Sequence, residues 1–283
     1  MRRMLPPVWP LHTLVIFDCD STLSAIEGID ELARLGGAGA EVAALTNRAM
    51  DGDLPLEAVY GQRLETANPT RAQVRAIAAT YRETVTDGAQ AVIEALQALG
   101  TAVFIVSGGL FESVRDFGVW LGVPREHIFA VGMEYDQLAG EWWRYWEQPG
   151  GRNPRANYLA HEAHPLSEAN GKNRIIREIR QEYPGRAMLI GDGSSDLEAA
   201  REVDMFVGFG GVAYRAAVAA ASPVYLRLPS LAPILPLAVG QLGNTPRFSQ
   251  LWAEGLDHMQ NGGAAFRDTQ LEEAFWGAVS IVK

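Results

Sequence analysis

The 283-residue sequence is poor in cysteine and in basic residues, and it lacks a long uninterrupted hydrophobic run. Its one cysteine, Cys19, cannot form a disulfide within the chain, which excludes a disulfide-stabilised scaffold and is compatible with a reducing compartment. Lysine and arginine total 24 against 34 aspartates and glutamates, which gives a formal net charge of −10. Because binding to a nucleic-acid backbone requires a basic surface, we expect no nucleic-acid partner.

No segment has the length and apolarity of a membrane span. The most apolar stretch near the end, residues 226–240, contains Arg227 and three prolines. The first residues place two arginines before an apolar stretch, as a signal peptide does, but prolines interrupt it and no small-residue cleavage site follows. We therefore expect a short tail that leads into a strand, no membrane partner and a cytoplasmic protein.

What the sequence does contain is the composition of an ordinary globular protein. Hydrophobic residues make up 48% and charged residues 20%, which is enough apolar material for a sizeable core. The length fits one large domain, or a core with an insertion.

Apolar runs of strand length alternate with helical periodicity over most of the chain. Expected strands cover residues 13–17, 102–106, 187–190, 205–207 and 224–228, and expected helices cover residues 90–99, 111–121, 173–183, 195–202 and 214–221. Strands that alternate with helices favour a parallel sheet with helices on both faces. The predicted fold class is therefore α/β, with a doubly wound parallel sheet.

One long stretch breaks this alternation. Residues 26–85 carry only helical signals, among them a helix start at Asp53 and Pro55 and a capping box from Thr70 to Gln73. We predict a small helical cap at residues 26–85, inserted after the first strand of a core formed by residues 1–25 and 86–240. Within the core, residues 134–146 are expected to form a hairpin around Ala139–Gly140, followed by a loop at 148–154.

Residues 241–283 are predicted to form a helical extension. Helical periodicity is found at residues 248–259 and 269–281, with three aromatic side chains, Trp252, Phe275 and Trp276. Aromatic residues at this spacing usually pack against other apolar surface. We expect the extension to pack on the core or on a partner subunit, in which case the chain would form a homodimer.

Three expected strands end in polar residues, namely Asp18, Ser107 and Asp192. In an open parallel sheet the ligand site lies beyond the carboxyl ends of the strands, so these side chains are expected to lie together. Asp20 and Asp196 add two carboxylates, and crowded carboxylates resist joint ionisation unless a cation lies between them. Oxygen ligands alone favour Mg²⁺. Asp18 or Asp192, taken singly, is equally compatible with ending a strand or capping a helix.

Two further signals suit a phosphate group. Ser107-Gly108-Gly109 lies between a strand and a helix, where a hydroxyl and backbone N–H groups can bind an anion. Lys172, just before a helix, offers a positive charge. Alone, the first is also a good strand-to-helix turn, and the second is more often a solvated lysine.

The order of these motifs carries more information than any one of them. Asp18-x-Asp20-x-Thr22, then Ser107-Gly108-Gly109, then Lys172, then Gly191-Asp192-Gly193-x-x-Asp196 resembles the haloacid-dehalogenase-like superfamily of aspartate-nucleophile phosphatases. Within that superfamily the chain is similar to the phosphoserine phosphatases. Glu27, Arg48-Ala49-Met50, Arg63 and Gly208-Phe209-Gly210-Gly211 extend the similarity, which covers residues 12–240 apart from 134–170.

The resemblance implies a mechanism and a set of site residues. Asp18 would be the nucleophile that forms an aspartyl-phosphate, and Asp20 would be the general acid and base. Mg²⁺ would be held by Asp18, the carbonyl of Asp20 and Asp192, with Asp196 in support. Ser107, Gly108 and Lys172 would bind the phosphoryl group.

The resemblance also implies a small phosphorylated metabolite as substrate, with O-phosphoserine, and hence L-serine biosynthesis, as the first expectation. Glu27 would meet the substrate ammonium and Arg63 the carboxylate, with Met50, Leu56 and Gly109 beside them. Leu56 stands where this family often has an aromatic residue, which keeps other substrates open: a phosphorylated sugar acid, phosphocholine or phosphoethanolamine, or a methionine-salvage intermediate. A non-catalytic binding protein with this fold is the alternative from another class.

Overall fold

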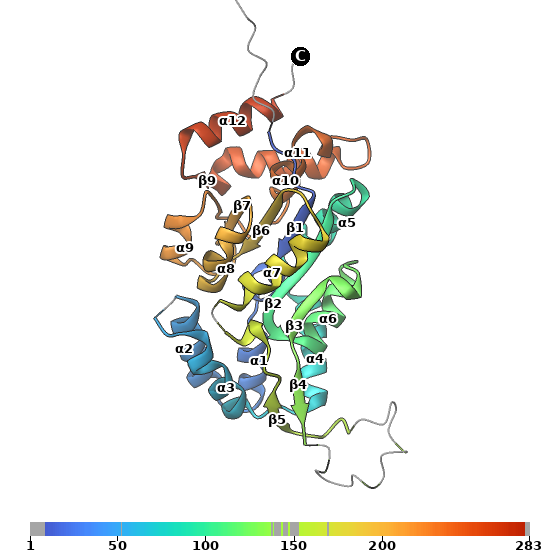
Figure 1. The fold of residues 1–283 in the computed structure, drawn as a ribbon, viewed down its shortest axis with the longest axis vertical. Helices are drawn as coiled ribbons and strands as arrows, with labels where there is room; N and C mark the ends of the chain where they lie inside the picture. Colours follow the sequence, from blue (N-terminus) through green and yellow to red (C-terminus); the bar gives the residue numbers. More distant parts are fainter. Residues whose placement is uncertain are drawn as a thin grey trace, which may run out of the picture.

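The computed structural model describes residues 9–280 except 52, 137, 139–142, 144–146, 148–152 and 169. A seven-stranded sheet runs through the centre of the molecule, in the order β3-β2-β1-β6-β7-β8-β9 (Figure 1). Its strands are β1 (Leu14–Phe17), β2 (Ala102–Leu110), β3 (Ile128–Val131), β6 (Ala187–Gly191), β7 (Met205–Phe209), β8 (Val224–Leu226) and β9 (Ala264–Phe266). Every neighbouring pair is parallel except β8 and β9. The predicted α/β class with a parallel sheet is confirmed.

The central strand β1 is buried along its whole length, as its unbroken apolar sequence predicts. It pairs with β2 on one side and with β6 on the other, so that Phe17 lies beside Ile105 and Ile190. The residues that follow these three strands therefore come out at the same edge of the sheet.

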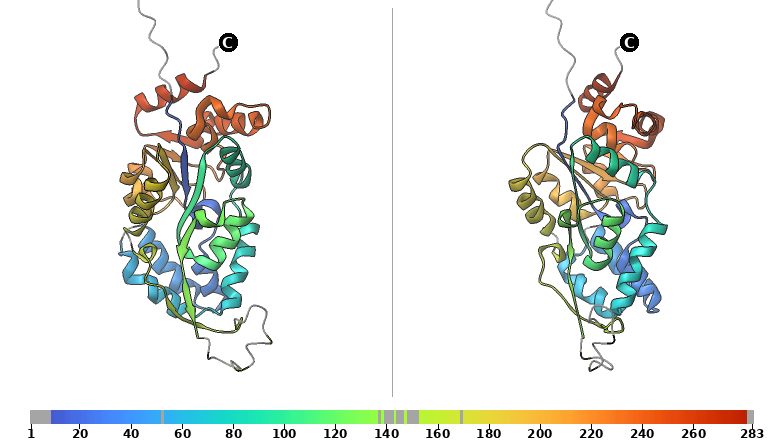
Figure 2. Two further views of the ribbon diagram at one scale, coloured as in Figure 1. Left: turned by 45° about the vertical axis from the view of Figure 1, so that its right-hand side comes forward. Right: turned by 90° about the vertical axis from the view of Figure 1, so that its right-hand side faces the viewer.

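Helices cover both faces of the sheet (Figure 2). One face carries α5 (Ala89–Ala98), α6 (Phe111–Trp120) and α10 (Ile234–Val239), and the other carries α7 (Gly171–Glu182), α8 (Ser194–Ala199) and α9 (Ala216–Ala221). The predicted helices of the core are found within a few residues of their expected bounds. The helix α10 was not predicted, because its segment contains prolines. Among the described residues, no helix is long and apolar enough to cross a membrane.

Four helices follow β1 in the sequence and precede α5. In space they lie at the end of the molecule that faces the carboxyl ends of the strands (Figure 1). They are α1 (Gly28–Leu35), α2 (Gly39–Met50), α3 (Leu56–Ala67) and α4 (Arg71–Glu83). The capping box of α4 is confirmed: the Thr70 hydroxyl accepts from the Gln73 amide and the Gln73 side chain accepts from the Thr70 amide. We call these four helices the cap; its bounds as a domain stay a prediction.

A two-stranded antiparallel ribbon, formed by core residues, lies beside the cap. It pairs β4 (Met133–Tyr135) with β5 (Tyr158–His161), and so differs from the predicted hairpin within residues 134–146, because the partner of β4 lies some twenty residues further along the chain. The expected turn at Ala139–Gly140 lies outside the described residues. The Tyr158 amide donates to the Pro69 carbonyl and the Arg71 amide donates to the Ala156 carbonyl, so the ribbon is joined to the start of α4.

The C-terminal extension packs on the core at the end of the sheet opposite the cap (Figure 1). The helices α11 (Ser249–His258) and α12 (Thr269–Val279) match the predicted ones, and β9 between them adds an antiparallel edge strand that the sequence did not reveal. Trp252 and Phe275 are buried, and Phe275 lies 5.0 Å from the ring of Trp9. These aromatic residues therefore pack within the chain, and the homodimer stays a prediction.

Candidate active site

The site begins at the carboxyl end of β1, where the chain makes a tight turn over Cys19–Leu23. Ser21 takes a left-handed conformation in this turn, with φ of 52°, which is rare for a residue other than glycine. The turn places the Asp18 and Asp20 side chains on the cavity side, while the Cys19 side chain is fully buried in the core. Burial raises the pKa of the Cys19 thiol well above its usual range.

Asp20 is oriented by two hydrogen bonds from the cap. Its Oδ1 accepts from the Gly28 amide at 2.7 Å and from the Tyr81 hydroxyl at 2.6 Å. A side chain at Gly28 would have its Cβ 2.2 Å from the Tyr81 hydroxyl, so this approach requires glycine. Burial raises the pKa of Asp20 to about 6, although the Tyr81 hydrogen bond acts in the opposite direction. The carboxyl can therefore carry or release a proton near neutral pH.

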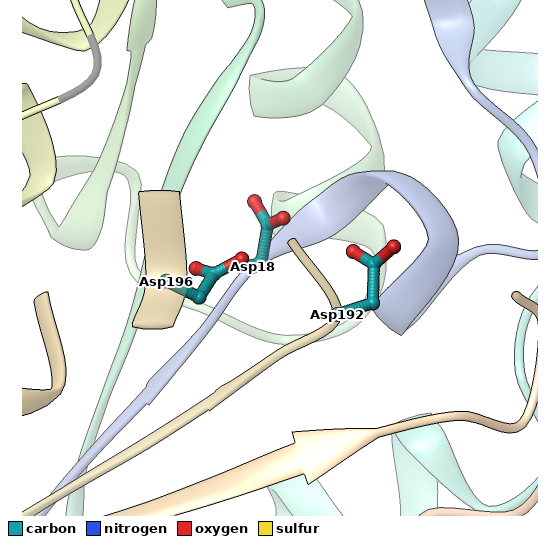
Figure 3. Close-up of side chains that lie close together, drawn as sticks. All are labelled: Asp18, Asp192 and Asp196. Atoms are coloured by element: carbon teal, nitrogen blue, oxygen red, sulfur yellow. The ribbon is translucent and has the colours of Figure 1, made fainter. Parts of the chain in front are cut away.

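Asp18, Asp192 and Asp196 form a buried acidic cluster beside the turn (Figure 3). One carboxylate oxygen from each lies within 4.8 Å of the others. The Lys172 ammonium lies on one side of the cluster, 2.9 Å from Asp18 Oδ1 and 2.6 Å from Asp196 Oδ1. Burial lowers the pKa of Lys172, but these two carboxylates outweigh it and hold the pKa above its usual range. Lys172 was predicted to lie just before a helix, but in the structure it is the second residue of α7.

This cluster has the donor set and the unmet charge of a divalent-cation site. Burial raises the pKa of Asp192 to about 7 and that of Asp196 to about 8, with the charge on Asp18 adding to both shifts. Asp192 Oδ1 is buried without a hydrogen-bond partner among the described residues, whereas both oxygens of Asp196 have one, from Lys172 and from the Gly193 amide. Asp18 and Asp192 therefore fit direct ligands of a hard cation, and Asp196 fits a supporting position.

Ser107 lies inside β2, which continues through Ser107-Gly108-Gly109 to Leu110 before α6 begins. The sequence had placed these three residues in a turn after the strand. The Ser107 side chain is buried, and its hydroxyl oxygen accepts from the Gly109 amide at 3.0 Å. The Gly108 carbonyl accepts from the hydroxyl of Tyr60, a cap residue, at 2.8 Å.

Glu27 and Arg63 place a carboxyl group and a guanidinium on the cap side of the cavity. Glu27 accepts a 2.6 Å hydrogen bond from the Ser21 hydroxyl, and burial together with Asp20 and Asp192 raises its pKa well above the usual range. Arg63 is buried; its Nη1 donates to the Thr46 hydroxyl at 3.1 Å, and its Nε has no hydrogen-bond partner among the described residues. A buried guanidinium with an unused donor is suited to a carboxylate ligand.

A cavity between cap and core brings the predicted residues together. Those that line it are Asp18, Asp20, Glu27, Met50, Leu56, Arg63, Ser107, Gly108, Gly109 and Lys172. Asp192 and Asp196 do not line this cavity, and both side chains are fully buried. Ile29, Tyr60, Leu64, Leu110 and Ser195 also line the cavity and were not predicted to do so.

Several polar residues of the site were not found from the sequence, among them Tyr60, Tyr81 and Arg215. Tyr60 and Tyr81 carry no motif, and their partners Gly108 and Asp20 lie 48 and 61 residues away. Arg215, buried just before α9, donates to Asp192 Oδ2 at 3.1 Å. The one feature of the sequence that could have indicated Tyr60 is its spacing from Leu56, because residues four apart lie on the same face of a helix.

A family model described as haloacid dehalogenase-like hydrolase matches residues 15–201, which contain the four ordered motifs from Asp18 to Asp196. The chain belongs to the haloacid dehalogenase-like hydrolase family. The matched residues begin in β1 and end after α8, and so include the cap and the acidic cluster. The resemblance stated from the motifs is confirmed, and with it the assignment as a hydrolase.

Several relatives of this chain have the name phosphoserine phosphatase. The chain is 34% identical over 198 residues to the phosphoserine phosphatase of Mus musculus, covering 70% of this chain and 81% of the relative. It is 33% identical over 216 residues to the chloroplastic phosphoserine phosphatase of Arabidopsis thaliana, covering 75% and 68%. A solved phospho-aspartyl intermediate analogue of phosphoserine phosphatase is 25% identical, with a TM-score of 0.64 over 80% of this chain and 98% of that one.

Proposed function

We propose that this hydrolase is a Mg²⁺-dependent phosphatase that acts on O-phosphoserine, and that its product is L-serine. The observation that carries the proposal is a single cavity with two chemically different walls. The core wall holds Asp18, Ser107 and Lys172, and the cap wall holds Glu27 and Arg63. A phosphorylated amino acid has matching groups: a phosphate for the first wall, and an ammonium and a carboxylate for the second. The names of the relatives support the same substrate.

In this proposal Asp18 attacks phosphorus, and the bond from phosphorus to the serine oxygen breaks as the aspartyl-phosphate forms. Asp20 gives its proton to the departing oxygen, then takes a proton from the water that attacks the aspartyl-phosphate, which releases inorganic phosphate and restores Asp18. Ser107 and Lys172 bind the phosphoryl oxygens, where most of the stabilisation of phosphoryl transfer is needed.

Asp18, the carbonyl of Asp20 and Asp192 would hold the Mg²⁺ ion, which when bound offsets the negative charge of the phosphate and of the nucleophile. The buried Asp192 Oδ1 and the crowding of three carboxylates support this assignment.

Phosphate release from a panel of phosphomonoesters, with Mg²⁺ and with EDTA, tests the chemistry. We expect Asp18→Asn to lower kcat by about a thousandfold or more, because the amide cannot form the intermediate, while thermal unfolding shows that the variant is folded. An Asp18→Asn variant with undiminished turnover would contradict the mechanism, whereas a wild type that releases no phosphate from any member of the panel would favour a non-catalytic binding protein.

The substrate is tested by comparing O-phosphoserine with phosphoethanolamine, which has the ammonium but not the carboxylate. We expect Arg63→Met to raise KM for O-phosphoserine by about 10- to 100-fold and to change phosphoethanolamine turnover little, because a charge-assisted two-pronged contact is lost only for the first. Arg34→Met, at an exposed arginine of α1 paired with Glu31, is the matched control. Equal effects of Arg63→Met on both substrates would contradict the contact between Arg63 and the substrate carboxylate, and would leave the phosphatase chemistry intact.

A further inference from the structure

Arg215 is a buried arginine whose guanidinium has acidic partners in both the core and the cap. Its Nε donates to Asp192 Oδ2 at 3.1 Å, and its Nη1 donates to Asp51 Oδ1 at 3.0 Å. Asp192 follows β6 and belongs to the acidic cluster, whereas Asp51 follows α2 of the cap. One side chain therefore joins a candidate metal ligand to the cap.

The surrounding contacts show that this part of the cap docks closely on the loop that carries Asp192. The Ser194 hydroxyl donates to the Ala49 carbonyl at 3.0 Å. A Cβ at Gly193 would lie 2.7 Å from Cε at the end of the Met50 side chain, so the two segments are in close contact here. Residues 49–51 of the cap thus lie against residues 192–194 of the core, with Arg215 beside both.

Arg215 also determines which oxygen of Asp192 is free. With Oδ2 hydrogen-bonded to the guanidinium, Oδ1 is the oxygen without a partner among the described residues. A lysine would not hold the Asp192 carboxylate in the same orientation, because a guanidinium presents its donors in a fixed plane, whereas the donors of an ammonium rotate freely about its last bond. The hydrogen bond thus restrains rotation of the Asp192 carboxylate.

We infer that Arg215 is a positioning residue that couples docking of the cap to the orientation of Asp192 as a metal ligand. The inference rests on the proposed function, because it needs Mg²⁺ at the acidic cluster. If docking of residues 49–51 and the orientation of Asp192 share one guanidinium, each favours the other, and Mg²⁺ binding must by linkage favour the docked cap by the same factor.

Titration of the full-length protein with Mg²⁺ alone, followed by calorimetry, tests the coupling without any turnover. We expect Arg215→Met to weaken Mg²⁺ binding by about 10- to 100-fold, as loss of a residue that orients a metal ligand does. Asp51→Asn is expected to weaken it by about fivefold, through cap docking only. Asp53→Asn, at an exposed aspartate two residues away, is the matched control and should bind Mg²⁺ as the wild type does.

The double variants give the decisive comparison. Because Asp51 acts through Arg215, adding Asp51→Asn to Arg215→Met should cause no further loss of Mg²⁺ affinity. Thermal unfolding without metal shows whether Arg215→Met is folded; if it is not, Arg215→Lys keeps the charge, and adding Asp51→Asn to it should likewise change nothing.

Wild-type Mg²⁺ affinity in both Arg215 variants would overturn the inference, as would independent, multiplying effects of the Arg215 and Asp51 substitutions. Either result would leave the proposed function standing if the wild type binds Mg²⁺ and releases phosphate. A wild type that binds no Mg²⁺ and has no Mg²⁺-dependent phosphatase activity would instead refute the proposed function, and the inference with it.

Discussion

The orientation of Asp20 depends on a residue with no side chain. Alanine at Gly28 would place its Cβ 2.2 Å from the Tyr81 hydroxyl, so either the tyrosine or the Gly28 amide must move away from Asp20. We expect Gly28→Ala to lower kcat by roughly 10- to 100-fold, since a small misplacement of a proton-transferring group has this effect. Steady-state kinetics with O-phosphoserine measure it.

Gly61→Ala is the control for this substitution. Gly61 lies in α3 of the same cap, and its added Cβ would meet His161 at an ordinary contact distance of 3.5 Å. Unchanged kcat in Gly28→Ala would show that the contacts from Gly28 and Tyr81 do not orient Asp20 for proton transfer.

Among single residues, the sequence was sufficient for those that lie in motifs and insufficient for those that act across the fold. The sequence could place Asp18, Ser107 and Asp192 together because each lies at or near the carboxyl end of an apolar run, and the three runs form neighbouring parallel strands. Tyr81 and Arg215 could not, because their contacts with Asp20 and Asp192 exist only once the cap or the loop before α9 is in place. No local pattern encodes such a contact.

At the scale of elements, the same distinction separates what was predicted from what was missed. Strands β1, β2 and β6 have long apolar runs and were predicted, although β2 extends through the glycines at 108 and 109. Strands β5 and β9 are short and partly exposed, and each depends on a partner distant in sequence, β4 or β8. Their pairing stabilises them more than their own composition does.

The helix α12 allows a test of the extension that is independent of the site. Phe275 is fully buried among the rings of Trp9, Phe266 and Trp276, at centroid distances of 5.0, 5.6 and 5.0 Å. We expect Phe275→Ala to lower the free energy of unfolding by about 3–5 kcal/mol, because it removes a large buried ring. Denaturant unfolding measures this, and kcat of the folded variant should stay near that of the wild type.

A substitution in the same helix that should raise the free energy of unfolding serves as a control. Gly277 has open space around its would-be Cβ, so Gly277→Ala should raise the free energy of unfolding by about 0.5–1 kcal/mol through helix propensity alone. A Phe275→Ala variant that unfolds as the wild type does would mean that α12 contributes nothing to the stability of the core.

At the scale of the whole molecule, stability should depend on pH through a histidine far from the cavity. His12 is buried just before β1, where its Nδ1 lies 3.3 Å from the Ala238 carbonyl, and burial lowers its pKa to about 4. In the unfolded chain its pKa is about 6.5. Between these two pKa values the unfolded chain binds a proton at His12 and the folded protein does not. The free energy of unfolding therefore falls as the pH falls from about 6.5 towards 4.

Relative to a His12→Gln variant, we expect the wild type to lose about 2 kcal/mol of unfolding free energy between pH 7.5 and pH 5. Urea unfolding of both proteins at the two pH values measures the difference. The comparison with the variant is needed because the raised pKa values of Asp192 and Asp196 act in the opposite direction. Parallel pH dependence of the two proteins would show that His12 is not held neutral by the fold.

The distribution of tryptophan over this architecture has an optical consequence. Trp9 and Trp252 are buried, and Trp276 lies against Phe275, all at the end of the sheet opposite the cap, whereas residues 26–85 contain no tryptophan. Intrinsic fluorescence at this end reports on the junction between extension and core, while a cap that moves over the cavity changes no indole there. Trp120 of α6, by contrast, has its ring centroid 5.9 Å from the guanidinium carbon of Arg82 in α4, so its fluorescence is an intrinsic signal that can report on the cap.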